Sequence, residues 1–169
     1  MPSLIPLSQV SPPLIEELLD RAFDPRRRTR TAYRLREGTQ WLSGLSFAAL
    51  DADEMLLGSI QCWPVALTEP EGRAHPLIMV GPVAVLPKAQ GLGYGKALME
   101  ASLAALDPRA PLPQVMIGDA EYYGRFWGYS NAATGGWSLP GPWDRHRLLV
   151  RCADPALLPR EGMLGPWRG

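Results

Sequence analysis

The chain has few of the residues that several common kinds of site require. Its only cysteines are Cys62 and Cys152, too few for a disulfide scaffold and without the spacing of a metal site. Lysine occurs only at Lys88 and Lys96, which leaves little basis for covalent catalysis through an amine. No apolar run approaches the ~20 residues of a membrane span, and the N-terminus lacks a signal-peptide pattern. These absences predict a cytoplasmic protein with reduced cysteines, no metal and no membrane partner.

A charge of one sign is also missing. Lys+Arg and Asp+Glu both number 17, so the formal net charge is zero and no global field attracts the protein to nucleic acid. With 169 residues, 46% of them hydrophobic, the chain is long enough to bury a core. We therefore expect one domain over residues 1–169 and no nucleic-acid partner.

What is present is a β-branched segment that ends in glycines and opens a helix, between Val83 and Lys96. The first turn of a helix has main-chain N–H groups without internal partners and carries the positive end of the helix dipole. Gly91, Gly93 and Gly95 remove the Cβ atoms that would keep a phosphate away from these groups. The segment therefore predicts a site for a phosphate-bearing ligand.

Two familiar phosphate-binding motifs do not fit this segment. A Walker A loop requires Ser or Thr after Gly-Lys, but Ala97 follows Lys96, and Gln90 stands where the first glycine belongs. A dinucleotide fingerprint requires a third glycine at the position of Lys96. ATP hydrolysis and hydride transfer are therefore not indicated.

The pattern Gln90-x-x-Gly93-x-Gly95 behind Val-x-Val-x-Pro resembles motif A of the GNAT superfamily of acyl-CoA-dependent N-acyltransferases. The resemblance implies an α/β fold with a central, mixed, mostly antiparallel sheet, splayed at the strand before the CoA-binding helix and flanked by about four helices. It also implies acetyl-CoA as cosubstrate. The implied strand contacts with the pantetheine arm are at Val83 and Val85, and the implied pyrophosphate contacts are at Gln90, Gly91, Gly93, Gly95 and Lys96.

A second segment, Glu121 to Tyr129, resembles the signature of the fourth helix in the same family. A tyrosine at this place often protonates the departing CoA thiolate in the family, and a phenol of pKa ~10 suits that role. The resemblance favours Tyr123, with Tyr122 as the alternative. The interval from Tyr123 to Gly128 is one residue longer than usual, so an extra residue or a bulge in the helix is expected.

Periodicity, prolines and glycines predict the remaining elements. Thr134 to Trp143 has so much glycine and proline that no regular element is expected there, and the segment after Pro155 is left to cover either the chain's own core or a neighbour. The predicted strands are 3–9, 45–51, 55–67, 76–86, 114–118 and 148–152, and the predicted helices are 12–23, a short one that ends at 38, one from the glycines to about 106, and 120–127.

Several residues permit more than one interpretation. The basic stretch from Arg26 to Arg30 is interpreted as solvated surface, with a loop at the acceptor site as the alternative. Cys62 is not favoured as a covalent acyl carrier, because nothing near it in sequence indicates an activated thiolate. No general base is compelling among the acidic and imidazole candidates, which are Glu69, Glu71, His75, Asp119 and Glu121.

The sequence thus predicts an N-acetyltransferase in which an acceptor amine attacks bound acetyl-CoA directly. A main-chain amide of the strand, at Val83, polarises the thioester carbonyl, and Tyr123 supplies a proton to the sulfur. The acceptor is expected to be a small-molecule amine or a peptide amine, and a homodimer, common in the family, stays open. The alternatives are a non-catalytic acyl-CoA-binding regulatory domain of the same fold and a protein-interaction domain with a vestigial loop.

Overall fold

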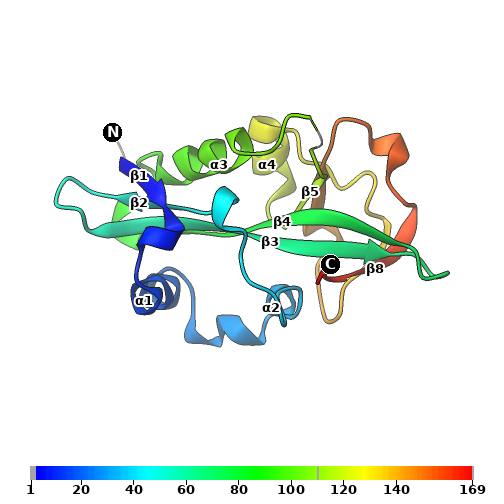
Figure 1. The fold of residues 1–169 in the computed structure, drawn as a ribbon, viewed down its shortest axis with the longest axis horizontal. Coiled ribbons are helices and arrows are strands. Elements are labelled where there is room, and N and C mark those ends of the chain that lie inside the picture. The colour runs from blue at the N-terminus through cyan, green and yellow to red at the C-terminus, as the bar shows by residue number, and fades with distance from the viewer. Residues whose placement is uncertain (1–2, 110, 169) are drawn as a thin grey trace. The chain divides into compact units, whose positions relative to one another are not determined.

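The computed structural model describes residues 3–109 and 111–168 of the chain, which divide into two compact units. The first unit comprises the chain up to Arg28 together with residues 41–62 and 80–108, and the second comprises residues 29–40, 63–79 and the chain from Arg109 onward. Figure 1 shows the elements. The strands are β1 (Ser3–Pro6), β2 (Phe47–Leu50), β3 (Leu56–Thr68), β4 (Ala74–Val85), β5 (Gln114–Ile117), β6 (Gly136–Ser138), β7 (Leu148–Arg151) and β8 (Glu161–Pro166), and the α-helices are α1 (Pro12–Ala22), α2 (Thr31–Arg34), α3 (Tyr94–Ala104) and α4 (Ala120–Trp127).

The described strands form one mixed sheet, which confirms the predicted α/β class. Its strand order is β1-β2-β3-β4-β5-β7, and β8 pairs with both β3 and β6. The pairs β1/β2, β2/β3, β3/β8 and β5/β7 are antiparallel, whereas β4/β5 and β6/β8 are parallel. The parallel pair β4/β5, in which Ile78 lies opposite Gln114, is the one predicted for a strand, crossover helix and strand.

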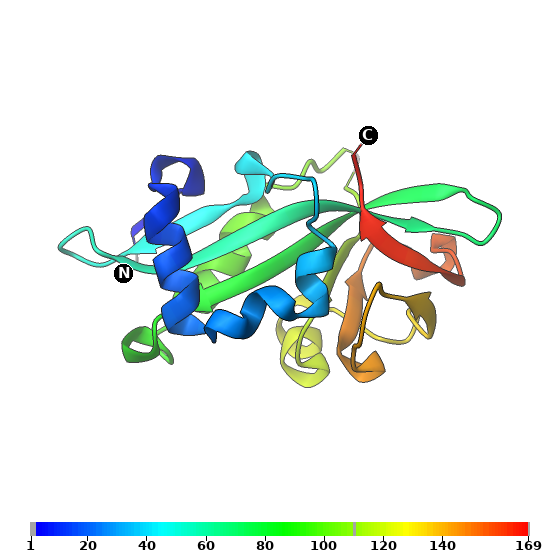
Figure 2. The same ribbon diagram turned by 90° about the horizontal axis from the view of Figure 1, so that it is seen from below.

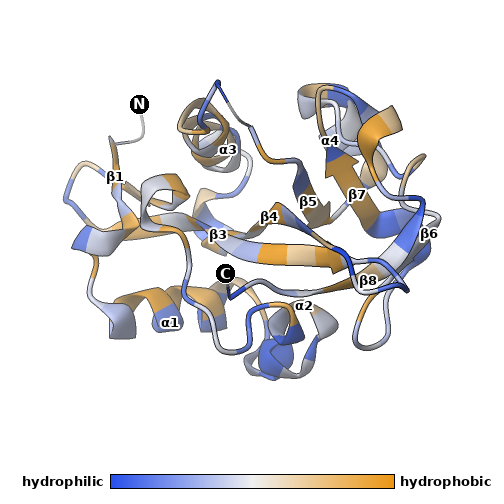
Figure 3. Cartoon of the chain, turned by 45° about the vertical axis from the view of Figure 1, so that its right-hand side comes forward, coloured by the Kyte–Doolittle hydropathy of each residue, from blue (hydrophilic) through white to orange (hydrophobic). Residues whose placement is uncertain are grey.

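In the first unit, alternate residues of β3 face two different helices. Leu57 packs in a cluster with Ile15, Leu18 and other buried residues of α1, whereas a Cβ on its neighbour Gly58 would lie 3.2 Å from Leu98 of α3. Because side chains alternate along a strand, α1 and α3 cover opposite faces of this part of the sheet, as Figure 1 shows. Helix α1 is amphipathic, with hydrophobic and hydrophilic residues alternating along it in Figure 3.

The second unit has a core built around a tryptophan that the sequence placed in a loop. Trp137 is fully buried with Val65, Leu67, Val115 and Leu148, and its indole N–H donates to the carbonyl of Pro159 at 2.9 Å. The prediction of no regular element over Thr134–Trp143 is therefore wrong in part, since β6 lies within it. The burial of Trp137 holds these three residues in a strand despite the flanking glycines.

The C-terminal segment also forms a strand that was not predicted. Residues of β8 pair with β3, with Leu164 opposite Leu67, and Leu164 is buried in the same core. Figure 2 shows this segment crossing the end of β3. The segment therefore covers the chain's own core. The pattern Glu-Gly-Met-Leu-Gly-Pro lacks the β-branched residues by which strands are recognised, and only the partner strand specifies it.

Several other boundaries differ by a few residues from the prediction. The first strand ends at Pro6, because a short 3₁₀ turn takes Leu7–Gln9. Ser11 is at the N-cap of α1 as predicted, but its side chain makes no capping hydrogen bond. Helix α3 ends at Ala104, and α4 has the bounds that the sequence predicted.

The sequence predicted that the basic stretch is solvated surface, and this prediction is wrong in part. Arg27 is only 2% exposed, and its guanidinium contacts Glu16 at 2.5 Å and Asp20 at 3.0 Å. Both carboxylates lie on α1, so the arginine ties the following 3₁₀ turn, Pro25–Thr29, to that helix. Arg26, by contrast, has a side chain that is 88% exposed. Arg27 therefore has a structural role, and the more exposed Arg28 also contacts Glu16, at 3.2 Å.

We predict that Arg27→Ala lowers the free energy of unfolding by about 2 kcal/mol, measured by urea denaturation. The loss stays at this level because Glu16 and Asp20, with 53% and 40% of their side chains exposed, are solvated again once the arginine is gone. The matched variant Arg26→Ala is expected to change stability by less than about 0.5 kcal/mol. Equal effects of the two substitutions would contradict the structural role of Arg27.

Candidate functional site

The turn from β4 into α3 has the backbone geometry that its glycines require. A 3₁₀ turn over Pro87–Ala89 follows the strand, and Gly91 and Gly93 then adopt φ of +80° and +90°. Residues with a Cβ adopt such angles at a cost of about 1–2 kcal/mol. A Cβ built on either glycine would meet no atom within 4 Å, so the backbone angle and not crowding within the protein calls for glycine.

Helix α3 begins directly after the exposed residues of this turn. Gly93 is the N-cap, and as a glycine it has no side chain that could accept a hydrogen bond from the first turn of the helix. Residues 90–93 are exposed, while Tyr94 and Gly95 are partly buried. Unsatisfied donors at the positive end of a helix of this length form an anion site.

The turn is anchored to the core of the first unit. Leu86 and Ala89 are buried in the same cluster as residues of α1, and the amide N–H of Leu86 donates to the carbonyl of Leu57 at 2.8 Å. The side-chain amide of Gln90 donates to the carbonyl of Val85 at 3.2 Å, which ties the loop back to the end of β4. The turn is therefore fixed on one side and open on the other.

The strand residues of the predicted site lie just before this turn in the same unit. Val83 and Val85 are half-buried on β4, and Val85 contacts the position of Gly58 on β3. The predicted CoA residues Val83, Val85, Gln90, Gly91, Gly93, Gly95 and Lys96 thus form one continuous strand, turn and helix start within a single unit.

Two buried polar side chains near this strand escaped the sequence analysis. Ser59 and Gln61 lie on one face of β3, are 0% and 4% exposed, and have Oγ and Oε1 atoms without a hydrogen-bond partner among the described residues. The amide N–H of Leu86 donates to the carbonyl of Leu57, so the residues that follow Leu57 on β3 lie across from those that precede Leu86 on β4. Ser59 and Gln61 therefore lie across from the stretch that contains Val83. Because buried polar groups are nearly always hydrogen-bonded, we expect an ordered water or a ligand atom there. Their signal was polar residues at alternate positions of an apolar strand.

The candidate tyrosines lie on α4 in the second unit. The Tyr123 ring packs edge-on against Tyr122 and Tyr129, with ring centroids 5.0 and 6.2 Å apart. Burial raises the pKa of the Tyr123 hydroxyl above its ordinary value of 10.0, and the neighbouring Tyr122 and Asp119 raise it further, against a lowering by Arg147. A group that is still protonated at neutral pH can act as a proton donor.

Tyr122 differs from Tyr123 in its surroundings. Its side chain is among the exposed aromatic residues of the chain, at 36%, and it packs against Phe126 and Trp127 on the outside of α4. Tyr123 is partly buried, and a phenol that is shielded from bulk water is better placed for directed proton transfer. The comparison of the two residues therefore favours Tyr123.

The longer interval between Tyr123 and Gly128 does not come from a bulge, which corrects the expectation from the sequence. Helix α4 is a regular α-helix over its eight residues. It ends with Gly128 at φ +76°, and the N–H of Tyr129 donates back to the carbonyl of Tyr123 at 3.3 Å. The N–H of Gly128 donates to the carbonyl of Gly124 at 3.1 Å, as in an αL C-cap, and this cap places the glycine at the end of the helix.

The candidate bases have structural partners. Asp119 is the N-cap of α4 and accepts a hydrogen bond from the N–H of Glu121 at 3.0 Å. His75 Nε2 lies 2.9 Å from Glu69 Oε2, so these two candidates are paired with each other near the turn between β3 and β4.

Cys62 is buried, and desolvation raises its pKa to about 11, with a hydrogen-bonding contact to Ser102 acting in the opposite direction. That thiol is unsuited to carry an acyl group.

The described residues contain neither a group of side chains suited to a metal ion nor a helix that could cross a membrane. No group of three or more His, Cys, Asp or Glu side chains within residues 3–109 and 111–168 is arranged to hold a metal ion. Within the same ranges, no helix is long and apolar enough to cross a membrane.

A known protein family matches the part of the chain that contains the glycine turn. The model of the acetyltransferase (GNAT) family matches residues 13–110, which include β4, the turn and α3. A comparison with curated protein sequences gives no match.

Solved structures resemble the chain along most of its length. A GNAT family N-acetyltransferase, YhbS, from Escherichia coli in complex with CoA is 26% identical, with a TM-score of 0.73 over 98% of this chain and 89% of that chain. A GNAT family acetyltransferase from Brucella melitensis in complex with acetyl-CoA is 23% identical, with a TM-score of 0.67 over 99% and 97% of the two chains. The N-acetyltransferase YlbP from Bacillus subtilis in complex with coenzyme A is 15% identical, with a TM-score of 0.52 over 89% and 96%. The last two likenesses concern the fold alone.

The state of Cys62 gives a testable prediction. In a Cys152→Ser variant, Cys62 is the only thiol, and a pKa of about 11 leaves it almost wholly protonated at pH 7.5. We expect alkylation by iodoacetamide to be on the order of 100-fold slower than that of a free thiol, because the thiolate is the reactive form. Unfolding in urea should restore the ordinary rate. Rapid alkylation of the folded protein would reopen a covalent role for Cys62.

Proposed function

Because the chain belongs to the acetyltransferase (GNAT) family, we propose that it is an N-acetyltransferase that moves the acetyl group of acetyl-CoA to an amine. The observation that carries the proposal is the glycine turn before α3, whose exposed main-chain N–H groups suit the pyrophosphate of CoA. The E. coli relative in complex with CoA supports the cosubstrate. Single-domain organisation over residues 1–169 and the cytoplasmic location expected from the composition belong to the same proposal.

The proposed CoA contacts follow the order of the chain. Val83 and Val85 pair with the pantetheine arm, and the turn from Gln90 to Lys96 holds the pyrophosphate. The anchoring of this turn by Leu86, Ala89 and the Gln90 side chain supports the assignment, since a fixed turn presents its donors without an ordering cost.

The proposed chemistry is a direct attack without a covalent enzyme intermediate. The lone pair of the neutral acceptor amine forms a bond to the thioester carbonyl carbon, and the main-chain amide of Val83 stabilises the resulting oxyanion. The C–S bond then breaks, the thiolate takes the proton of the Tyr123 hydroxyl, and the proton lost by the amine leaves to solvent or returns to the tyrosine. The packing of Tyr123 against the rings of Tyr122 and Tyr129 supports its role, because it shields the proton transfer from bulk water.

The acceptor is proposed to be a small-molecule amine or a peptide amine, in agreement with the chemistry of the family, and a homodimer belongs to the same proposal. A non-catalytic domain that only binds acyl-CoA is the alternative. It drew its support from the longer tyrosine interval, and the C-cap of α4 accounts for that interval by ordinary helix geometry. CoA binding without thiol release over a broad panel of amines would favour this alternative.

Gly93→Ala is expected to weaken CoA binding at least about tenfold, measured by titration calorimetry, because the added Cβ strains the turn and enters the space in front of the helix start. Gly72→Ala is the matched control, since Gly72 also has a positive φ, of +99°, and open space around its Cβ. Both variants should lose about 1–2 kcal/mol of stability from the backbone strain. If the two bind CoA equally well, the turn does not hold the pyrophosphate.

Tyr123→Phe is expected to lower kcat for thiol release about 100-fold or more while the Kd for CoA changes less than about twofold. Tyr122→Phe, the neighbouring hydroxyl deletion, should leave kcat within about twofold. The split between kcat and Kd separates a loss of proton donation from a loss of packing. A fall in kcat for Tyr122→Phe alone would assign the role of proton donor to Tyr122. Unchanged turnover in both variants would exclude both tyrosines as the proton donor.

A further inference from the structure

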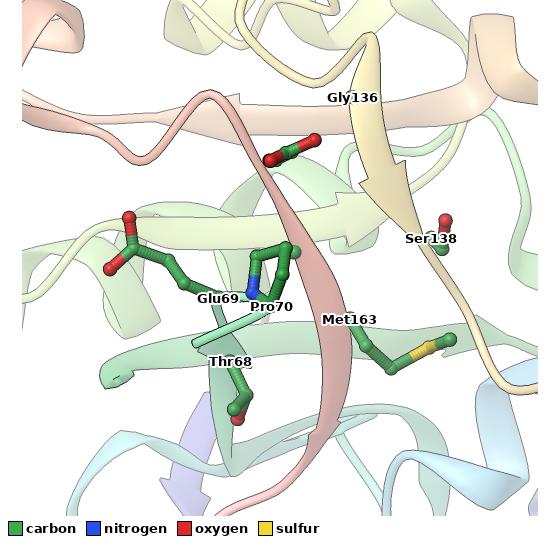
Figure 4. Close-up of a pocket in the computed structure, with 8 residues that line it drawn as sticks. Thr68, Glu69, Pro70, Gly136, Ser138 and Met163 are labelled. Carbon is green, nitrogen blue, oxygen red and sulfur yellow. The ribbon is translucent and has the colours of Figure 1, made fainter. Parts of the chain in front are cut away.

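A pocket of about 520 Å³ lies in the second unit, where β3 ends beside β8 and β6. Figure 4 shows its side chains, with Thr68, Glu69 and Pro70 at the end of β3, Ser138 on β6 and Met163 on β8. Its volume falls in the range of ligand pockets, roughly 300–1,000 Å³. None of the contacts argued above for CoA uses it.

The pairing of the strands explains why the pocket forms on this side of the sheet. Met163 of β8 lies opposite Thr68 of β3 and also opposite Ser138 of β6, so these three side chains share one face. Trp137 and Leu164, the residues next to Ser138 and Met163, point to the other face and are buried in the core. The face that carries the pocket is therefore fixed by the burial of its opposite face.

Two glycines permit the strands that line the pocket to approach one another closely. Gly136 lies opposite Glu161 in the ladder between β6 and β8, and a Cβ at Gly136 would collide with the carbonyl oxygen of Arg160. Gly162 is also required, since its Cβ would lie 2.8 Å from the carbonyl oxygen of Thr68. The two glycines therefore let the strands beside the pocket approach closely.

The lining has acidic and apolar components and no basic one. Pro70 and Met163 supply apolar surface, and 48% of Met163 is exposed. Glu69 and Glu161 contribute two carboxyl groups, while no lysine, arginine or histidine is among the residues that line the pocket. Thr68 and Ser138 add hydroxyl groups that accept hydrogen bonds.

One of the two carboxyl groups is held in place and kept ionised. Glu69 has 22% of its side chain exposed, and its Oε2 is hydrogen-bonded to Nε2 of His75 at 2.9 Å. This contact, with a smaller contribution from the positive charge of Arg73, lowers the pKa of Glu69 below its ordinary value of 4.5. The pocket therefore has a fixed negative charge at neutral pH, partly shielded from water, beside an apolar wall.

We propose that this pocket binds a primary ammonium group on a short aliphatic chain, with the ammonium at Glu69 and Glu161 and the chain against Pro70 and Met163. An ammonium has three N–H donors, which suits two carboxylates and the hydroxyls of Thr68 and Ser138. The pocket goes beyond the proposed acetyl transfer, and its occupancy does not depend on that function.

The test is an NMR titration of the full chain with pentylamine, followed at the ¹³C-labelled methyl group of Met163 and the amides of Gly136 and Gly162. We expect saturable shifts at these three reporters. The uncharged analogue 1-pentanol should bind at least about tenfold more weakly, the equivalent of about 1.4 kcal/mol. Shifts that map elsewhere on the chain, or equal affinities for the amine and the alcohol, would overturn the proposal.

Glu69→Gln and Glu161→Gln are each expected to raise the Kd for pentylamine about threefold to tenfold. Glu17→Gln removes the same charge from an exposed position of α1 in the other unit and should leave the Kd unchanged. The amide spectra and melting temperatures of the variants establish that each is folded. An unchanged Kd in both pocket variants would also overturn the proposal.

The titration is made without CoA, so its outcome is separate from that of the proposed transferase. CoA affinity is measured on the same samples by calorimetry, and the pocket variants should retain it. Failure of CoA to bind the unmodified chain would count against acetyl transfer and leave the amine titration untouched. Failure of the amine titration with intact CoA binding would count against the pocket alone.

Discussion

The turn between β4 and α3 depends on a balance between burial beneath it and exposure above it. Leu86 and Ala89 are drawn into the core under α1, which fixes the end of the strand, and Gly91 and Gly93 then turn the backbone through positive φ. Since the N-cap of α3 is a glycine, the N-cap residue supplies no side-chain acceptor to the first N–H groups of the helix. The turn that completes the core with Leu86 and Ala89 therefore also presents the N-terminus of α3 to an anion. The proposed binding of CoA depends on this connection.

The two units differ in the charge that they offer a ligand. In the first, main-chain dipoles at the start of α3 favour negative charge. In the second, the carboxylates of Glu69 and Glu161 beside an apolar wall favour positive charge. The chain has no net charge, so neither preference follows from composition. Each comes from the local arrangement of a few groups, because groups in direct contact with a ligand act on it more strongly than the total charge of the chain.

The sequence predicted best where local rules and tertiary contacts agree. Helix α4 has its predicted bounds, because Asp119 caps its start and Gly128 its end, and both signals are local. The sequence failed where a distant contact overrides composition. Arg27 is one of a run of arginines, and only the position of α1 selects it for burial against Glu16 and Asp20. Likewise, β6 and β8 stabilise each other through a parallel pairing between segments that have little strand propensity of their own.

By itself, the sequence determined the strand, glycine turn and helix at Val83–Lys96, because glycine tolerance of positive φ and the period of buried residues are properties of adjacent positions. It also determined that Tyr122 and Tyr123 share a short capped helix. Only the tertiary structure decided that Tyr123 is more buried than Tyr122, and that Ser59 Oγ and Gln61 Oε1 have no hydrogen-bond partner among the described residues. It also decided that Glu69 meets His75 at a pocket beside β8. Burial, partner and pKa depend on residues that are distant along the chain, and a local pattern cannot specify them.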